Sequence, residues 1–331
     1  MEYTKDLNWK RNITLKELMK DLGKVGFQSI ELARASEIIV KMKKNNAKIF
    51  FTFTSNMVTS GLRGFFSQVI KLGMADFIVT TTGGIEEDIM KAIGEKFLIS
   101  SFYVNDVKLH EEGKNRVGNL LIDNESYCRF EDYITLILNE LYKKKKTYSV
   151  SEMLYEIGLK LKDENSILYQ AAKKKIPIYC PAITDGALGF HLYLFKQKHN
   201  DFNVDIIDDF KRIITEIGFD DKKGLISLGG GVSKHHAILA SLLNGGLDYA
   251  VYMTTSQASS GSMSGANTNE AKSWGKIKDN SDAVTVIGEV SITFPLAMMN
   301  AFEILSDEGI IEASLEKNLQ EKKTTDENER S

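Results

Sequence analysis

The sequence of 331 residues has few of the residues that most often cross-link or break up a fold: two cysteines, three prolines and two tryptophans. The cysteines, Cys128 and Cys180, are too few for a disulfide framework or a cysteine-rich zinc site, and neither lies in a C-x-x-C pair. We therefore expect both to be buried small apolar residues, and we expect no metal site.

The sequence also lacks an excess of one charge and a long apolar run. Its 42 Lys and Arg against 45 Asp and Glu give a net charge of −3, which provides no general field for nucleic acid or an anionic membrane. The lysine runs at 143–146 and 173–175 are typical of solvated helix ends. No apolar stretch approaches the roughly 20 residues of a membrane span and the N-terminus has no secretory apolar segment, so we expect a cytoplasmic protein.

The hydrophobic residues, 43% of the chain, follow alternating helical and strand patterns. Residues 13–22 and 30–42 have apolar residues at helical spacing, and the run at 47–55 then indicates a buried strand. Further short strands, each followed by Gly, Ser or Thr and a helical pattern, are expected at 75–84, around Pro177, and at 223–231, 247–256 and 282–291. Almost wholly apolar strands that alternate with helices predict a doubly wound α/β fold, with a mostly parallel sheet covered on both faces.

Two segments depart from this alternation. Residues 101–130 are irregular and polar, and we expect an insertion of loops and short elements within the same domain. From about residue 316 the chain is charged and has no apolar period, which predicts disorder. We therefore expect one domain over residues 1–315 and a disordered tail over residues 316–331.

Glycines and small polar residues follow most of the expected strands. In an open parallel sheet, ligands bind beyond the carboxyl ends of the strands, and glycines there let backbone N–H groups approach a phosphate at a helix N-terminus. The groups concerned are residues 54–56, 80–84 with Glu86 and Glu87, 185–186, 229–231 and 254–257. Because the triple glycine lacks the last glycine of a G-x-G-x-x-G pattern, a simple tight turn remains an alternative.

His235 and His236 follow the triple glycine at the start of an expected helix. Adjacent side chains on a helix are about 100° apart, so at most one of them can face the crevice at the strand ends. Such a pair does not chelate a metal as an i, i+4 pair does. A structural or capping histidine and a general acid or base both remain open.

The stretch 254–276 is long and rich in small residues, and it ends in Glu270, Trp274 and Lys276. A flexible surface loop is one interpretation. The other is a nucleophilic lysine, because partial desolvation beside a large ring favours the neutral amine over the ammonium. Sites of α/β enzymes are often built on loops of this kind.

Several composite motifs point to one family. "GGGVSKHH" (229–236), "DYAVYMTTSQ" (248–257), "GSMSGANTNEAKSWGKI" (261–277) and, earlier, "TDGALG" (184–189) resemble the deoxyhypusine synthase family in order and spacing. "TSNMVTSG", "TTGGIEED", "NRVGNLLIDNESYCRFED" and "SITFPL" extend the resemblance over roughly residues 10–305. The short N-terminus and the few prolines are more typical of archaeal or bacterial members than of animal ones. The resemblance implies a Rossmann-like sheet.

The resemblance also implies an NAD-dependent transferase. Members of this family use NAD to remove hydride from spermidine and transfer its four-carbon amine to an enzyme lysine as an imine. They then pass it to a lysine of the translation initiation factor 5A precursor, where reduction yields deoxyhypusine. By motif position the enzyme lysine is Lys276, and His235 handles the proton near the oxidised carbon. A homotetramer with active sites between paired subunits is implied as well.

The same resemblance assigns the binding residues. The amine is expected to contact Asp185, Tyr252, Glu270 and Trp274, with Asp185 between substrate and cofactor. The cofactor is expected to contact Ser55, Asn56, Thr59, Thr81, Gly83, Glu87, Asp185, Gly230, Gly231, Thr255, Ser256, Ser264 and Glu289. At Glu289 the family usually has an aspartate, a difference of one methylene that still lets a carboxylate reach ribose hydroxyls.

Four positions depart from the eukaryotic pattern of the family. Phe190, Ser260 and Met263 stand where acidic residues hold the ammonium groups of spermidine, and Leu239 replaces a polar residue. The amine donor and the acceptor therefore stay open. One alternative is a homospermidine synthase with putrescine as acceptor, and another is a catalytically silent NAD-binding paralogue that regulates a partner subunit.

Overall fold

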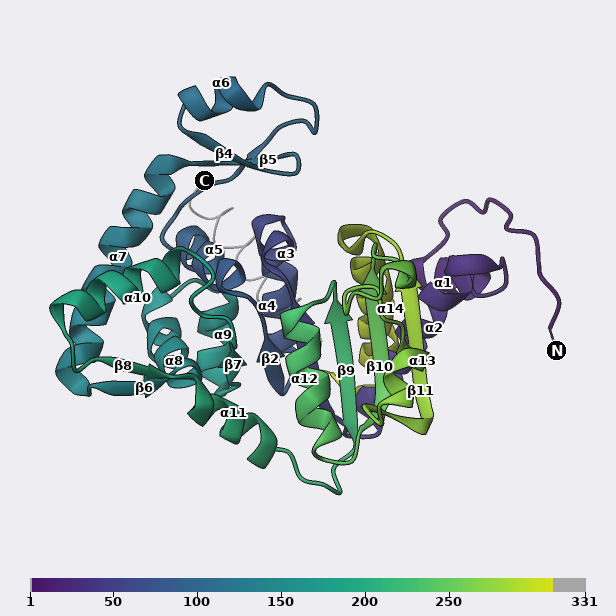
Figure 1. Cartoon of the computed structure of the whole chain (residues 1–331). Helices are drawn as coiled ribbons and strands as arrows, with labels where there is room; N and C mark the ends of the chain where they lie inside the picture. Colours follow the sequence, from purple (N-terminus) through teal and green to yellow (C-terminus); the bar gives the residue numbers. More distant parts are fainter. Residues whose placement is uncertain (1, 312–331) are drawn as a thin grey trace, which may run out of the picture.

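A six-stranded parallel sheet forms the centre of the protein, whose computed structural model describes residues 2–311 (Figure 1). The strands lie in the order β11-β10-β9-β1-β2-β7, and every neighbouring pair is parallel. Their bounds are β1 (Lys48–Phe53), β2 (Phe77–Val79), β7 (Ile178–Tyr179), β9 (Lys223–Leu228), β10 (Leu247–Thr254) and β11 (Ile277–Ile287). The doubly wound α/β fold predicted from the alternating pattern is confirmed.

Alternate side chains of each strand enter two apolar layers. In β1, Phe51 packs in a cluster with residues of α2 (Phe27–Lys44) and α14 (Val290–Asp307), and its ring stacks on Phe294 at a centroid distance of 5.7 Å. Phe50 enters the opposite layer with Ile238 of α12 (Val232–Leu242) and Ala271 of α13 (Thr268–Ser273). Because successive strand residues face opposite sides, covering both faces requires an apolar residue at nearly every position.

The strand order reverses between β1 and β9. The sheet grows from β1 through β2 to β7 on one side, and from β9 through β10 to β11 on the other. In open α/β sheets the carboxyl ends at such a reversal form the ligand-binding crevice. Here α3 (Ser55–Thr59) follows β1 and the triple glycine follows β9, and a Cβ added to Gly229 would lie 3.4 Å from Thr54 Oγ1.

A layer of helices surrounds the β7 side of the sheet (Figure 1). It contains α5 (Thr82–Ala92), α7 (Asn124–Lys144), α8 (Val150–Leu161), α9 (Ile167–Lys174), α10 (Ala187–Lys198) and α11 (Ile206–Thr215), with the short parallel pair β6 (Thr147–Ser149) and β8 (Asn203–Asp205). The remaining helices are α1 (Leu15–Leu22), which packs against α2 and α14, and α4 (Arg63–Lys71), which packs against α9. As predicted, the lysines at 143–146 and 173–175 are exposed at helix ends.

The inserted segment contains short elements, as predicted, up to residue 123. It forms an antiparallel sheet of β3 (Leu98–Ile99), β5 (Leu120–Asp123) and β4 (Lys114–Val117), covered by α6 (Asp106–Glu111). Its last part, residues 124–130, is the first part of the 21-residue α7. Most of its polar residues are exposed on this helix, whereas Ser126 and Phe130 are buried.

Two smaller predictions also need correction. The strand expected over 75–84 is limited to three residues, because α5 already begins at Thr82, with Thr81 at its N-cap position. Cys180 is buried as expected, but Cys128 is exposed on α7. The tail expected to be disordered lies outside the described residues. Within residues 2–311, no helix is both long enough and apolar enough to cross a membrane.

Candidate functional site

Lys276 is held between the end of α13 and the start of β11. Gly275 adopts a φ of +68°, and its N–H donates to the Lys272 carbonyl at 2.8 Å while the Lys276 N–H donates to the Ala271 carbonyl at 3.1 Å. These two bonds form a Schellman motif, which needs a left-handed residue and so explains the glycine between Trp274 and Lys276. The Lys276 carbonyl then accepts from the Leu247 N–H at 3.0 Å. The backbone of the candidate nucleophile is therefore fixed on both sides.

The Lys276 side chain enters a cavity of about 300 Å³ on the α12 face of the sheet. The cavity is lined by His235, Ile238, Tyr252, Gly261, Met263, Ala266, Asn267, Glu270, Ala271, Trp274 and Lys276. Both predicted catalytic residues and three of the four predicted amine-binding residues therefore meet in one place. Lys276 is buried, and its Nζ lies 4.9 Å from the centroid of the Trp274 ring, which remains two-thirds exposed.

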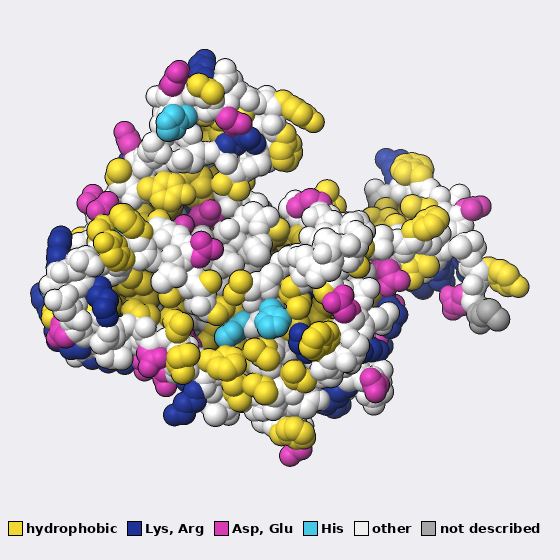
Figure 2. All heavy atoms as spheres, in the orientation of Figure 1, with side chains coloured by type: hydrophobic (Ala, Val, Ile, Leu, Met, Phe, Trp, Pro, Cys, Tyr) yellow, Lys and Arg dark blue, Asp and Glu magenta, His cyan; other side chains and the backbone are white. Residues whose placement is uncertain are grey.

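The two histidines diverge as helical geometry predicts. His235 lines the cavity, and burial together with the nearby Lys276 charge lowers the pKa of its imidazole. His236 instead packs against Phe210 at a centroid distance of 5.6 Å, and burial lowers its pKa to about 4. Figure 2 shows histidine side chains near the middle of this face, beside a hydrophobic surface. His235 is thus the only one of the pair placed for proton transfer in the cavity.

Tyr252 brings an unpaired hydroxyl to the cavity. Its side chain is 2% exposed, and its OH has no hydrogen-bond partner within residues 2–311. Burial raises the pKa of the phenol, so it stays protonated and can donate or accept a hydrogen bond. Because a buried unpaired hydroxyl is costly, its position favours a bound polar ligand.

Glu270 is the one carboxylate among the lining residues of this cavity. It lies in the first turn of α13, where the Asn267 side chain accepts from the Glu270 N–H at 2.9 Å and caps the helix. A negative charge is favourable at a helix N-terminus. The arrangement offers one anionic contact for an ammonium group.

The predicted cofactor residues that follow β1 and β2 lie together at the carboxyl edge of the sheet. They are Ser55, Asn56, Thr59, Thr81, Gly83 and Glu87, from α3 and the start of α5. The two helices approach so closely that a Cβ on Gly83 would lie 2.7 Å from the Ser55 Cβ, so only glycine fits. The Thr81 Oγ1 is buried without a partner in the described chain, as expected where a ligand supplies one.

Glu87 is a buried acid at this edge. Its Oε2 accepts a hydrogen bond from the Thr59 hydroxyl at 2.6 Å. Burial raises its pKa to about 7, while that hydrogen bond and the Lys91 charge oppose the rise. Lys91 donates to the carbonyls of Val58, Thr59 and Ser60 at 2.6–2.9 Å, which fixes the end of α3 against α5.

The remaining predicted cofactor residues follow β9, β10 and β11. They are Gly230 and Gly231, then Thr255, Ser256 and Ser264, and finally Glu289. The Ser264 hydroxyl donates to the Gly230 carbonyl, and the Gly288 N–H donates to the Thr254 carbonyl at 2.9 Å. Glu289 occupies the N-cap position of α14, and its carboxylate accepts from the Ser291 hydroxyl. The predicted cofactor residues thus form a continuous row along this edge of the sheet. The row runs from Glu289 to Gly83 and crosses the point where the strand order reverses.

Asp185 lies apart from the cavity. It is exposed in the turn before α10, and its charge raises the pKa of Glu86, which burial already raises. Glu86 accepts from the Leu188 N–H at 3.0 Å. Asp185 therefore belongs to the β2 and β7 end of the row, away from Lys276.

Among the four departures from the family pattern, Met263 alone lines the cavity in the described structure. Phe190 is 56% exposed on α10, and its ring lies near His191 and Tyr193. Ser260 is exposed in a 3₁₀ turn, and Leu239 is half-buried on α12. Met263 is therefore the departure that can change what this cavity holds.

Sequence reasoning missed two residues at the cavity: Lys234, which lies behind its wall, and Asn267, which lines it. Lys234 is almost completely buried, and its Nζ donates to the Ala266 carbonyl at 3.1 Å. The helical period did carry a signal, because Lys234 is three and four residues before Ala237 and Ile238, on a buried side of α12. Asn267 could have been identified as a helix cap from "NTNE".

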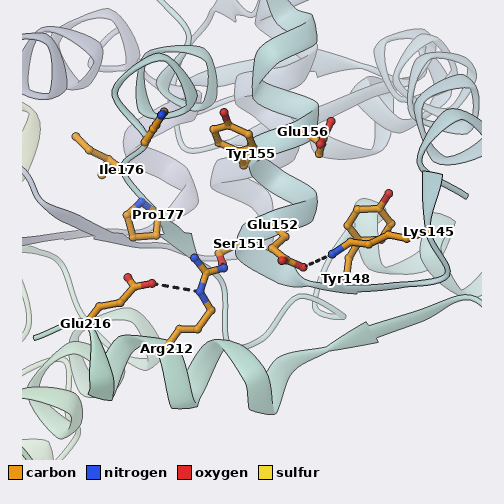
Figure 3. A pocket seen from close by; sticks show the side chains of 11 residues that line it. Lys145, Tyr148, Ser151, Glu152, Tyr155, Glu156, Ile176, Pro177, Arg212 and Glu216 are labelled. Atoms are coloured by element: carbon orange, nitrogen blue, oxygen red, sulfur yellow. Dashed lines mark hydrogen bonds and ion pairs between the residues drawn. The ribbon is translucent and has the colours of Figure 1, made fainter.

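A larger cavity, about 630 Å³, lies between α8, α11 and residues 175–177 (Figure 3). Its charges neutralise one another: Lys145 pairs with Glu152 at 2.7 Å and Arg212 with Glu216 at 3.2 Å. None of the predicted site residues lines it. The smaller cavity therefore remains the candidate active site.

Comparison with known proteins gives one consistent family. The sequence model for deoxyhypusine synthase matches residues 17–301. The "Probable deoxyhypusine synthase" of Thermoplasma volcanium is 40% identical over 296 residues, covering 88% of this chain and 95% of that protein. Its counterpart in Schizosaccharomyces pombe is 39% identical over 307 residues, covering 88% and 87%. The crystal structure of a "putative deoxyhypusine synthase" from Entamoeba histolytica matches with a TM-score of 0.66 at 28% identity, covering 91% of this chain and 97% of that one.

Proposed function

Because the chain belongs to the deoxyhypusine synthase family of aminobutyltransferases, we propose that it transfers the 4-aminobutyl group of spermidine to a protein lysine. The acceptor is a lysine of the translation initiation factor 5A precursor, and the group passes through an imine on Lys276. The observation that carries this proposal is the cavity that brings Lys276 together with His235, Tyr252, Glu270 and Trp274. Because the proposed acceptor is a translation factor precursor, we propose that the protein acts in the cytoplasm.

NAD is the cofactor that we propose for the crevice at the strand-order reversal. The buried, unpaired Thr81 hydroxyl fits a bound group that supplies its hydrogen-bond partner. The contacts would come from Ser55, Asn56, Thr59, Thr81, Gly83, Glu87, Gly230, Gly231, Thr255, Ser256, Ser264 and Glu289, with Asp185 at the end of the row. Bound there, NAD would accept a hydride from the amine and return it later, so that none is consumed.

The residues of the cavity supply the remaining chemistry. Glu270 pairs with the free ammonium of the amine and orients its chain. His235, whose lowered pKa keeps it neutral near pH 7, accepts the proton that leaves the amine nitrogen as its neighbouring carbon is oxidised. The Tyr252 hydroxyl gives the amine a hydrogen-bond partner inside the wall.

Lys276 then acts as the nucleophile. Its neutral amine forms a new C–N bond to the oxidised carbon, and the bond from that carbon to the departing propanediamine breaks. The Trp274 ring lies over Nζ and limits the access of water, which would otherwise hydrolyse the imine. Attack by the acceptor lysine on the same carbon releases Lys276 unchanged.

A second candidate function is homospermidine synthesis, in which putrescine is the acceptor. Glu270 as the one lining carboxylate and Met263 at an acidic family position favour it, because they define the amine spacing less strictly. For either reaction we propose a homotetramer with active sites between paired subunits. A silent NAD-binding paralogue would form no imine.

The test is to trap the imine. Purified protein with NAD and labelled spermidine is treated with borohydride, and peptide mass spectrometry should place the adduct on Lys276 only when both ligands are present. Lys276→Arg should abolish the adduct, because a guanidinium stays protonated. Lys272→Arg is the matched control: Lys272 lies on α13 and donates to the Asp279 carbonyl at 3.0 Å, outside the cavity lining. An adduct on another lysine, or none, would refute the assignment.

The product then separates the two candidates. With factor 5A precursor and putrescine supplied in separate reactions, deoxyhypusine as the main product supports the proposed function. Homospermidine alone supports the second candidate.

A further inference from the structure

Lys234 is a buried lysine that the proposed steps do not use. It lies in the first turn of α12, one residue before His235, and is 1% exposed. Its Nζ donates to the Ala266 carbonyl at 3.1 Å and lies 4.6 Å from the centroid of the Tyr252 ring. Both Ala266 and Tyr252 line the cavity that holds Lys276. Lys234 therefore contacts two residues that line the cavity but does not line the cavity itself.

The contacts of the Lys234 ammonium do not offset the free-energy cost of burying it. A buried ammonium is costly unless it is paired, and no carboxylate within residues 2–311 lies within ion-pair distance of its Nζ. One carbonyl and one ring face use only part of its three donors. An apolar side chain of similar length would fill the same space at lower cost. What the ammonium adds is attachment of two wall elements to α12.

Ala266 and Tyr252 are both close to the residues proposed to bind and react with the amine. Ala266 precedes Asn267, the residue that caps α13, and α13 carries Glu270 and ends at the turn that fixes Lys276. A carbonyl held at Ala266 therefore sets where this helix begins. The Tyr252 ring, held on its face by a cation, keeps its hydroxyl directed toward the same cavity.

We propose that Lys234 is a positioning residue, which ties the Ala266 carbonyl and the Tyr252 ring to α12 and so orders the amine-binding wall for the reaction proposed above. Its role is exerted through these two groups and not by contact with the amine. The inference rests on the proposed function for its kinetic consequence, whereas the ordering of residues 262–270 is a property of the protein alone.

The charge of Lys234 makes this role dependent on pH. Burial lowers the pKa of its ammonium to about 8, and the attraction of Glu270 on α13 opposes that change. The other titratable groups at this wall are Tyr252 on β10, His235 beside it on α12, and Lys276. Below pH 8 the ammonium holds both contacts; as pH rises through 8 the cation over the ring is lost and the bond to Ala266 weakens.

The experiment compares wild type with Lys234→Met, Lys234→Arg and a control, Lys223→Met. Lys223 is also fully buried, and its Nζ also donates to backbone carbonyls, those of Phe219 and Asp221 at 2.9 and 2.6 Å. It lies at the amino end of β9, on the opposite edge of the sheet from the crevice. It therefore controls for loss of a buried ammonium as such.

Two readouts are taken between about pH 6.5 and 9.5, the range in which an ammonium with a lowered pKa titrates. The first is hydrogen-exchange protection of the amides at 262–270, corrected for intrinsic rates. The second is kcat and KM for the amine together with the trapped Lys276 adduct. In wild type we expect protection and kcat to fall above pH 8. In Lys234→Met both should already be low at pH 7, with kcat reduced about tenfold or more, the factor for losing a hydrogen bond to a charged group.

Lys234→Arg should restore part of the protection and move the alkaline fall to higher pH, because a guanidinium keeps its charge. Lys223→Met should lower stability and leave the protection of 262–270 unchanged. The proposal is overturned if Lys234→Met keeps wild-type protection at pH 7, or if its alkaline fall is the same as in wild type. If wild type forms no Lys276 adduct, the proposed function fails, and the exchange data still decide the role of Lys234.

Discussion

Replacing Tyr252 by phenylalanine should stabilise the free protein and weaken its binding of the amine. The change removes one hydroxyl that is buried and has no partner in the described chain, and it keeps the ring that Lys234 contacts. Most Tyr→Phe changes in a core remove a hydrogen bond and therefore destabilise. Opposite signs for stability and binding are thus a specific signature of a hydroxyl reserved for a ligand.

The magnitudes follow from the environment of that hydroxyl. Leaving a buried polar group unpaired costs about 1–3 kcal/mol, so its removal should raise the free energy of unfolding by about 1 kcal/mol once the lost volume is considered. Where the hydroxyl bonds an ammonium, losing that bond costs about 1.5–3 kcal/mol, which weakens amine binding at least tenfold. Burial raises the pKa of Tyr252, so the phenol remains neutral, and both effects should be constant between pH 6 and 7, below the pH at which Lys234 loses its proton.

Urea denaturation of the unliganded protein measures the first effect, and calorimetric titration with spermidine in the presence of NAD measures the second. Tyr148→Phe is the matched control, because Tyr148 is equally buried and its OH donates to the Leu141 carbonyl at 2.8 Å. That variant should lose about 1 kcal/mol of stability and bind the amine as wild type does. If Tyr252→Phe is destabilised as much as Tyr148→Phe, its hydroxyl has a partner in the protein and the reasoning is wrong.

Three further predictions concern His235, Glu87 and Met263. His235→Ala should slow amine oxidation about a hundredfold or more, as loss of a general base does, with NAD affinity unchanged; stopped-flow absorbance and equilibrium titration measure the two, and an equal loss in both would indicate a structural histidine. Burial raises the pKa of Glu87 from 4.5 to about 7, so its contribution to stability is present below pH 4.5 and is lost as pH rises to 7. Glu87→Gln should therefore be more stable than wild type at pH 7.5 by about 3 kcal/mol and equal to it near pH 4.5, and a gap that does not vary with pH in urea denaturation would contradict the assigned burial. Wild type should discriminate by less than about a hundredfold in kcat/KM between amines that differ by one methylene, and Met263→Asp should sharpen that ratio; a stricter wild type would show that other groups set the amine spacing.

The sheet was predictable because the burial of its strands is visible in their amino-acid composition. Five of the six residues of β1 are buried, and a strand covered on both faces must be apolar nearly throughout. The length of β2 was not predictable in the same way. The three threonines from Thr80 to Thr82 have high strand propensity, yet Thr81 occupies the N-cap position of α5, because packing of Gly83 against Ser55 brings that helix close to β1.

The candidate site was predictable where function depends on local chain geometry, and not where it depends on packing. The glycine in "SWGK" indicates a helix end, and the Schellman motif at Gly275 shows why Lys276 must follow it directly. By contrast, Lys234 has the same residue type as dozens of surface lysines. Its burial is decided by Ala266 and Tyr252, which are distant in sequence and meet it only once α12 packs on the sheet.

The cofactor crevice and the amine cavity are joined by one segment, residues 255–267. At one end of α12 the Ser264 hydroxyl donates to the Gly230 carbonyl in the crevice, and two residues further on the Ala266 carbonyl accepts from Lys234 at the cavity wall. Gly230 lies just before α12 and Lys234 lies in its first turn, so both contacts fix the segment to the start of this helix. We therefore expect a ligand that shifts this segment at one site to change binding at the other. Titrating each ligand with and without the other can show this coupling. If the first ligand to bind orders the segment, it should raise the affinity for the second ligand, by the same factor in either order of addition.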